Sequence, residues 1–347
     1  MKGTKNCHNQ CGLSLVELLV AMAIGLVLLG GIYQAFFSST TTYENQQGSA
    51  RIQENGRFAL NVISKEIRLA GYLGCLSNPT TLTNTLNNSG NFLNNFAVGI
   101  EGFEATSDTA WDRALPTTLL NPLGGNDVLT IRGVDPSTRV TLTTAMPDSS
   151  ADLKSTPAAA GAPAPMADGD IVMISDCQNA AVFQVTNYTG SNGNVVHNTG
   201  ALSPGNATKN LGSPFATGAE ITRINVTSFF LSTNPQGQPA LYRVIGSGVP
   251  QELAEGVERM QLLYGVDTTL PAPDRVLDAY LAANAVTDWS RVLSVRIALL
   301  VRSPSEVAKA ELDTATYDLN GVAYDPPDDR RMRQVLTATV GLRNRLP

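Results

Sequence analysis

The chain has 347 residues, of which 43% are hydrophobic and 16% are charged, and its formal net charge is -6. This length allows one large domain or two modest ones, and the composition suits a folded protein with one membrane segment. The negative charge excludes a surface dominated by phosphate contacts and therefore argues against nucleic acid as a partner.

An apolar run without charged residues follows a short basic head. The head, residues 1–12, contains Lys2 and Lys5 but no acidic residue. Positive charge beside the first membrane segment stays in the cytoplasm, so the chain beyond the run should be exported. Residues 18–33 carry no charge, and residues 35–37 extend the run to the roughly 20 residues that cross a bilayer as a helix. Because no small-x-small cleavage site follows the run, we expect it to be retained.

Glu17 is an acidic residue inside this apolar segment. A carboxylate within the bilayer costs about 2.5–3.5 kcal/mol on insertion scales, so it needs a partner and predicts a functional site. The alternative is a glutamate near the membrane interface whose side chain reaches out to water.

The stretch Gly12-Leu-Ser-Leu-Val-Glu17 and the apolar run after it resemble the amino terminus of type IV pilins and pseudopilins. The resemblance implies that prepilin peptidase cleaves between Gly12 and Leu13 and that the new amino group of Leu13 is methylated. Glu17, the fifth residue after the cleavage site, would then supply the counter-charge for a protonated amino terminus in a helical bundle. The family usually has phenylalanine where this chain has Leu13, a position that tolerates other apolar residues.

The helix should continue beyond the membrane. Residues 38–50 are polar and contain no proline, and apolar residues then recur at three- and four-residue steps, as on one face of an amphipathic helix. These residues are Ala59, Val62, Ile63, Ile67 and Ala70. Gly71 and Gly74 predict the end of the helix. Gly48 and Gly56 each weaken it by about 1 kcal/mol relative to alanine, which allows a bend.

The rest of the chain predicts an α+β fold in which antiparallel sheet packs against the amphipathic helix. Strands are expected at residues 127–132, 139–144, 170–175, 181–186, 194–197, 221–232, 240–245, 257–265, 292–301 and 334–343. In the last two of these strands a period of two places the apolar residues on one face. The strands 170–175 and 181–186 suit a hairpin, and residues 273–283 suit a short helix. Loops are expected at residues 78–97, 155–168 and 187–219.

Four later segments are similar to PilW-type minor pilins, which are similar in turn to J-type minor pseudopilins of type II secretion. These segments are residues 68–75, 253–267, 294–303 and 337–345. Together with the amino terminus, they imply four regions with distinct roles. The regions are a cytoplasmic leader peptide (1–12), a transmembrane and pilus-core helix (13–40), an amphipathic periplasmic helix (41–72) and a β-rich globular periplasmic domain (73–347).

The resemblance implies a minor pilin that takes part in priming and assembly of type IV pili at or near the fibre tip. It would be a non-enzymatic subunit without a cofactor, held in the inner membrane by one helix and later part of the fibre. Its partners would be prepilin peptidase, other minor pilins, the major pilin and the inner-membrane assembly platform. Two alternatives remain open: a minor pseudopilin of type II secretion, and a tip binding module for adhesion or DNA uptake that uses residues 78–165 and 187–219.

Four cysteines divide between the head and the exported part. Cys7 and Cys11, even with His8, are too few ligands for a metal site and would leave with the leader. Cys75 and Cys177 are the only pair in the exported part, and an oxidising periplasm favours a disulfide between them. Closing a loop of about 100 residues would stabilise the fold by at most about 4–5 kcal/mol. The alternative is two buried free thiols.

Other chemistry finds little support in the sequence. His197 is the only histidine after the head, and we interpret it as a turn residue rather than part of a catalytic triad. No zincin, Walker or nucleophile-elbow motif occurs. The acidic loop 313–329 has oxygen ligands that could suit calcium but lacks an EF-hand register, so we expect a solvated loop and no metal. Charges that guard a sheet edge explain the nearby arginines better than DNA contacts do. These arginines are Arg330, Arg331, Arg333, Arg343 and Arg345.

Overall fold

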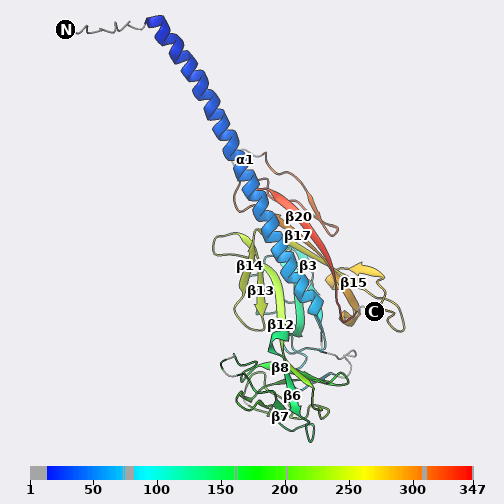
Figure 1. Ribbon diagram of the computed structural model, residues 1–347. Coiled ribbons are helices and arrows are strands. Elements are labelled where there is room, and N and C mark those ends of the chain that lie inside the picture. The colour runs from blue at the N-terminus through cyan, green and yellow to red at the C-terminus, as the bar shows by residue number, and fades with distance from the viewer. Residues whose placement is uncertain are drawn as a thin grey trace, which may run out of the picture.

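The computed structural model describes residues 14–72, 74, 82–159, 161, 163–200, 202–306 and 311–345. A long helix, α1 (Leu15–Leu69), leads into a β-rich body. Figure 1 shows the first half of α1 projecting freely and the second half lying along the body, with a separate lobe beyond the far end of the helix. The predicted α+β fold, a long amino-terminal helix packed on antiparallel sheet, is therefore confirmed.

The packed half of α1 buries one narrow stripe. Ala59, Ile63 and Ile67 have no exposed surface, and their steps of four residues keep them on one helix face. Gly56 lies on the same stripe, where an added β-carbon would sit 2.7 Å from Leu336 Cδ1. The helix runs through Gly56 without interruption, and this glycine permits close approach to the sheet. Gly71 follows the helix with a φ of +63°, a conformation that favours glycine.

The packed half of α1 lies against two sheets. The first has the order β16-β15-β17-β20 and is antiparallel throughout. Its strands are β15 (Val257–Val266), β16 (Ala279–Leu281), β17 (Val292–Arg302) and β20 (Arg333–Gly341). The predicted alternation holds in β20, where Leu336, Ala338 and Val340 all pack into the core that contains the helix stripe. In β17 both faces are buried, because Ala298 and Leu300 form a smaller cluster with Leu319 on the side away from the helix.

The second sheet is organised around the 14-residue strand β12 (Glu220–Thr233). One half of β12 pairs with strands beside the helix: β5 (Val128–Val134) and β13 (Pro239–Ile245), which carry β2 (Ile100–Phe103) and β14 (Gln251–Glu255) at the edges. The other half pairs with β8 (Ile171–Ser175) and β6 (Val140–Thr144) in the far lobe. Strand β12 therefore runs through both parts of the body (Figure 1).

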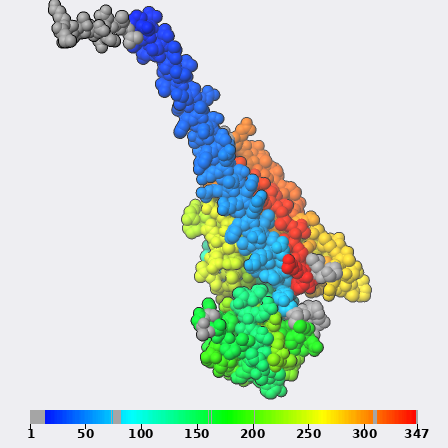
Figure 2. Space-filling view, viewed as in Figure 1, coloured from blue at the N-terminus to red at the C-terminus, as the bar shows by residue number. Residues whose placement is uncertain are grey.

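The far lobe, which we call the distal lobe, has its own apolar core. Leu142, Phe183 and Phe215 are among its buried residues, and the predicted hairpin between β8 and β9 (Ala180–Gln184) is confirmed. Its other strands are β1 (Leu82–Asn84), β7 (Leu153–Ser155), β10 (Asn187–Thr189) and β11 (Asn194–Val196). Strand β1 pairs with β9 in parallel, whereas the other strand pairs of this lobe are antiparallel. The distal lobe is the green mass at the end of the molecule opposite the start of α1 (Figure 2).

Short hairpins and 3-10 turns complete the body, and one expected helix is not found. They are the hairpins β3 (Ala105–Ser107)–β4 (Ala110–Trp111) and β18 (Tyr317–Leu319)–β19 (Val322–Tyr324), and the 3-10 turns η2 (Pro136–Thr138), η3 (Ala283–Ala285) and η4 (Trp289–Arg291). The helix expected over residues 273–283 is absent from the described chain. Instead, the Asp267 carboxylate accepts hydrogen bonds from Thr269 N and Arg275 N, which fixes a loop that returns as β16.

Candidate assembly site

The start of α1 is a capping box formed by Ser14 and Glu17. Ser14 Oγ accepts a hydrogen bond from Glu17 N at 3.2 Å, and Glu17 Oε2 accepts one from Ser14 N at 3.4 Å. This reciprocal arrangement satisfies two backbone donors that a helix otherwise leaves unpaired. It also holds the carboxylate beside the positive end of the helix dipole, where negative charge is favoured. The predicted assembly residue is thus fixed at the very beginning of the helix.

The first half of α1 exposes its apolar side chains on all sides. Leu15, Val27 and Ile32 are exposed by 75%, 76% and 66%. Among the described residues, α1 is the one helix long and apolar enough to cross a membrane, and the span that qualifies has no buried residue. A helix that is apolar all round needs lipid or other helices as its surroundings. The helix therefore has the character of a membrane anchor.

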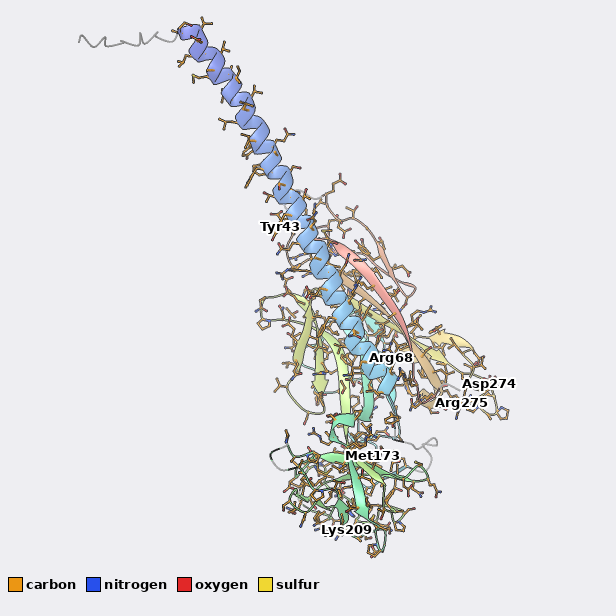
Figure 3. All side chains as sticks on the ribbon, in the orientation of Figure 1. Tyr43, Arg68, Met173, Lys209, Asp274 and Arg275 are labelled. Carbon is orange, nitrogen blue, oxygen red and sulfur yellow. The ribbon has the colours of Figure 1, made fainter. Side chains whose placement is uncertain are left out.

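The apolar surface ends in a group of aromatic rings. The rings of Tyr33 and Phe37 lie 4.3 Å apart between centroids, and Phe36 adds an edge contact to Phe37 at 6.3 Å. Aromatic side chains favour the boundary between lipid and water. Directly after them, Thr40 Oγ1 donates to the carbonyl oxygen of Phe36 four residues earlier. Figure 3 shows Tyr43 where α1 meets the body and Arg68 near the end of the packed half.

A buried ion cluster lies where β20 begins. The Arg333 side chain has no exposed surface and contacts Glu258 Oε2 at 2.7 Å, Asp329 Oδ1 at 2.7 Å and Asp313 Oδ2 at 3.0 Å. Arg302 Nη1 lies 3.3 Å from Glu258 Oε1 on the same side. The guanidinium fork of arginine suits several carboxylates at once. The cluster therefore ties β15, β17 and β20 to the loop before β20.

Comparisons with known proteins match both ends of the chain. Residues 7–33 match the prokaryotic N-terminal methylation motif, and residues 228–344 match the family model of the type IV pilus-assembly protein W, PilW. The chain thus carries a pilin-type methylation motif at one end and a region similar to PilW at the other. Among solved structures it is similar to a type IV-like pilin from Thermus thermophilus, with 10% identity and a TM-score of 0.33 over 86% of this chain and 98% of that chain. No curated protein matches the sequence.

Contacts within the chain hold two carboxylates of the acidic loop and two of the arginines. Two of the loop's carboxylates, Asp313 and Asp329, bind Arg333, and Asp329 Oδ2 also lies 3.7 Å from Arg331 Nε. Within the described ranges no group of three acidic, histidine or cysteine side chains could hold a metal ion. The expectation that these arginines guard a sheet edge is wrong for Arg333, which is buried. Arg345 also points inward, because its Nη1 donates to the carbonyl oxygens of Trp289 and Val292.

Of the remaining predicted site residues, Cys177 lies within the described chain. Cys177 is disulfide-bonded, with a φ of +72° in the turn between β8 and β9. Its expected partner, Cys75, lies outside the described residues, and so do Gly12 and Leu13. The pairing, the cleavage site and the methylation site therefore stay predictions.

His197 is a buried residue of the distal lobe rather than an exposed turn residue. It has no exposed surface, its Nε2 lies 3.0 Å from the Ala151 carbonyl oxygen, and its ring is 5.2 Å from that of Phe183. Burial lowers its pKa, so the neutral form is favoured.

Sequence reasoning missed a buried carboxyl group between the two sheets. Asp127 is 1% exposed, and its two oxygens accept hydrogen bonds from Ala105 N at 3.0 Å and Leu262 N at 2.7 Å. Burial, together with the nearby charge of Glu104, raises the pKa of Asp127 to about 8. The buried hydroxyl of Tyr264 has no hydrogen-bond partner. The only sequence signal was an acidic residue directly before a strand that opens with Val128 and Leu129.

We expect the stability of the protein to fall as pH rises from 6.5 to 8. The pKa of Asp127 is raised to about 8 in the folded state, whereas an unfolded aspartate titrates near ~3.9. The folded state therefore binds one more proton in this window, and stability decreases by up to about 1.4 kcal/mol per pH unit. Urea unfolding of the detergent-solubilised chain at several pH values measures this slope. Asp127→Asn should flatten it, and an unchanged slope in that variant would contradict the assignment.

Proposed function

We propose that this protein is a minor pilin that primes type IV pilus assembly and occupies a position at or near the fibre tip. It enters the inner membrane with its body in the periplasm, loses its leader between Gly12 and Leu13, is methylated on Leu13 and then joins the fibre. The observation that carries the proposal is the freely exposed apolar half of α1, capped at its start by Ser14 and Glu17. Such a surface can lie in lipid first and in a bundle of helices afterwards.

Glu17 gives this helix a means of joining the bundle. A protonated amino terminus and a carboxylate are both costly in lipid unless they pair. The capping box holds Glu17 within one helical turn of the proposed cleavage site, so its carboxylate can meet its own amino terminus or that of a neighbour. The other pilins, the major pilin and the assembly platform are the partners that this role requires, and prepilin peptidase is the enzyme that prepares it.

The position of the distal lobe supports a place at the tip. The lobe lies beyond the carboxyl end of α1, on the side away from the membrane-spanning half (Figure 1). In a fibre of parallel helices the body of the preceding subunit would occupy that side. A subunit with nothing above it avoids this conflict, which favours the end of the fibre.

The amino terminus of the mature protein provides the most direct test. We expect mass spectrometry to find a chain that begins with methylated Leu13. A Gly12→Glu variant should keep its leader, because the peptidase recognises the small residue before the cut. A mature protein that still begins at Met1 would overturn the proposal.

A deletion strain separates pilus assembly from type II secretion. Under the proposal the strain has few or no pili and normal secretion, and the wild-type gene restores the pili. Normal piliation together with lost secretion would instead select the pseudopilin alternative. The two outcomes concern different machines, so one strain decides between them.

The distal lobe also favours a second candidate function, which is binding at the tip. A groove of about 880 Å³ lies where the lobe meets the body, and Phe92, Asp170 and Asn225 are among its lining residues. Backbone amides, a carboxylate and an aromatic ring are the usual ingredients of a recognition site. Pili from a strain with Asn225→Arg should assemble normally but lose attachment to the surfaces that wild-type pili bind. Unchanged attachment would remove this candidate and leave the assembly role untouched.

A further inference from the structure

The outer edge of β20 carries backbone groups that nothing in the described chain satisfies. Strand β20 ends the four-stranded sheet and pairs only with β17. Leu342 N donates to the Leu293 carbonyl oxygen, and Ser303 N donates to that of Met332. Leu342 and Leu293 lie opposite each other, as do Met332 and Ser303, in one continuous antiparallel register. Every second residue of such a strand exchanges hydrogen bonds with its partner, so the backbone N–H and C=O groups of the even-numbered residues of β20 point toward β17. The odd-numbered residues, including Val335, Thr337 and Thr339, therefore point their N–H and C=O groups away from the sheet.

This edge lacks the usual protection against strand addition. Natural edge strands carry charges, prolines or bulges, or they are short. From Gln334 to Gly341 there is neither a charged residue nor a proline, and the pairing with β17 shows no register shift. Arg333 at its start is buried in the ion cluster and turned inward. Thr337 and Thr339 are exposed, and the red surface of this strand is open beside the helix in Figure 2.

We propose that the free edge of β20 accepts a β-strand from the globular domain of a neighbouring, different pilin subunit. The proposal rests on the proposed role in pilus assembly. Strand β20 lies directly against the packed half of α1, where Gly56 meets Leu336. A subunit whose helix bundles with the exposed half of α1 therefore comes alongside this edge. Main-chain hydrogen bonds of this kind add affinity without requiring side-chain pockets.

The geometry argues against a second copy of this chain as the occupant. Two β20 edges would pair most simply around a twofold axis, with the strands antiparallel. Since α1 runs along β20 (Figure 1), the same axis would turn the two helices in opposite directions. Both membrane-spanning halves could not then enter one bilayer from the same side.

Thr337→Pro tests the proposal without breaking the sheet. Proline is tolerated at an edge position whose N–H faces outward, so the variant should keep the wild-type melting temperature. It removes a donor and places a ring where an added strand would lie. A photo-reactive benzoylphenylalanine at position 339 of the full-length chain, in native cells, reports the neighbour. We expect a cross-link to another pilin-like protein, reduced about tenfold or more by Thr337→Pro.

Matched controls keep the outcome decisive. Thr337→Val retains the N–H and should cross-link like wild type, and the probe placed at the exposed Val322 of β19 should not capture the same partner. If Thr337→Pro fails to fold, the double variant Thr337→Lys with Thr339→Lys takes its place. It adds charges that disfavour an added strand, at two side chains that are already exposed to solvent. A folded edge variant that cross-links like wild type, or a probe that captures only a second copy of this chain, overturns the inference. Either of these results contradicts the inference about β20 only. If a deletion strain loses its pili, the proposed function is still supported.

Discussion

Replacing Arg333 with methionine is expected to destabilise the folded protein by about 3–5 kcal/mol, the usual cost of removing one partner from a buried ion cluster. The guanidinium is fully buried and contacts three carboxylates. Methionine fills a similar volume but leaves Glu258, which is 7% exposed at its side chain, without its shortest ionic contact. The shift in the urea midpoint of the full-length chain, at a constant denaturant slope, measures the loss.

Arg343→Met is the matched control for this substitution. Arg343 belongs to the same carboxyl-terminal segment but is exposed, and surface substitutions usually change stability by less than about 0.5 kcal/mol. A combined variant in which Arg333, Arg302, Glu258 and Asp313 all become apolar should recover part of the stability, because Asp329 still pairs with Arg331 and no buried charge of the cluster is left alone. Equal midpoints for Arg333→Met and Arg343→Met would show that the cluster does not hold the strands together.

The helix and the last strands could be predicted because their periodicity is local. The steps between Ala59, Ile63 and Ile67 already define one helix face, and the alternation of Leu336, Ala338 and Val340 already defines one strand face. Both sets lie in the same core. Each element is long enough for its period to dominate over propensity, which is the condition under which such predictions succeed.

The ion cluster could not be predicted because its members are far apart in sequence. Glu258, Asp313 and Arg333 meet only through the pairing of β15, β17 and β20. From the sequence, the carboxylates suggested a solvated loop and the arginines a guarded edge, since nothing local indicates that the two groups neutralise each other. The same limit applies to Asp127, whose partners Ala105 and Leu262 belong to different sheets. For His197 the polar neighbours in sequence concealed a buried environment.

Replacing Glu17 with glutamine is expected to lower incorporation of the protein into pili by about 100-fold. The estimate follows from the 2.5–3.5 kcal/mol that an unpaired charge costs within lipid, at about 1.4 kcal/mol per tenfold change. Glutamine can still accept the hydrogen bond from Ser14 N, because a capping box tolerates either residue at this position. The substitution therefore removes the charge and keeps the cap. Quantitative immunoblotting of sheared pili against whole cells measures incorporation.

Two further variants separate charge from helix capping. Ser14→Ala removes the hydroxyl that accepts from Glu17 N and should cost the helix about 0.5–2 kcal/mol, while the carboxylate remains available to an amino terminus. Glu17→Ala removes both the charge and the cap. If charge pairing drives assembly, Glu17→Gln and Glu17→Ala are equally defective and Ser14→Ala assembles almost normally. If Glu17→Gln assembles like wild type while Ser14→Ala and Glu17→Ala fail, Glu17 acts only as a capping residue. In every variant the body should keep its melting temperature, because Glu17 lies about 50 Å from the packed half of α1 at 1.5 Å per residue.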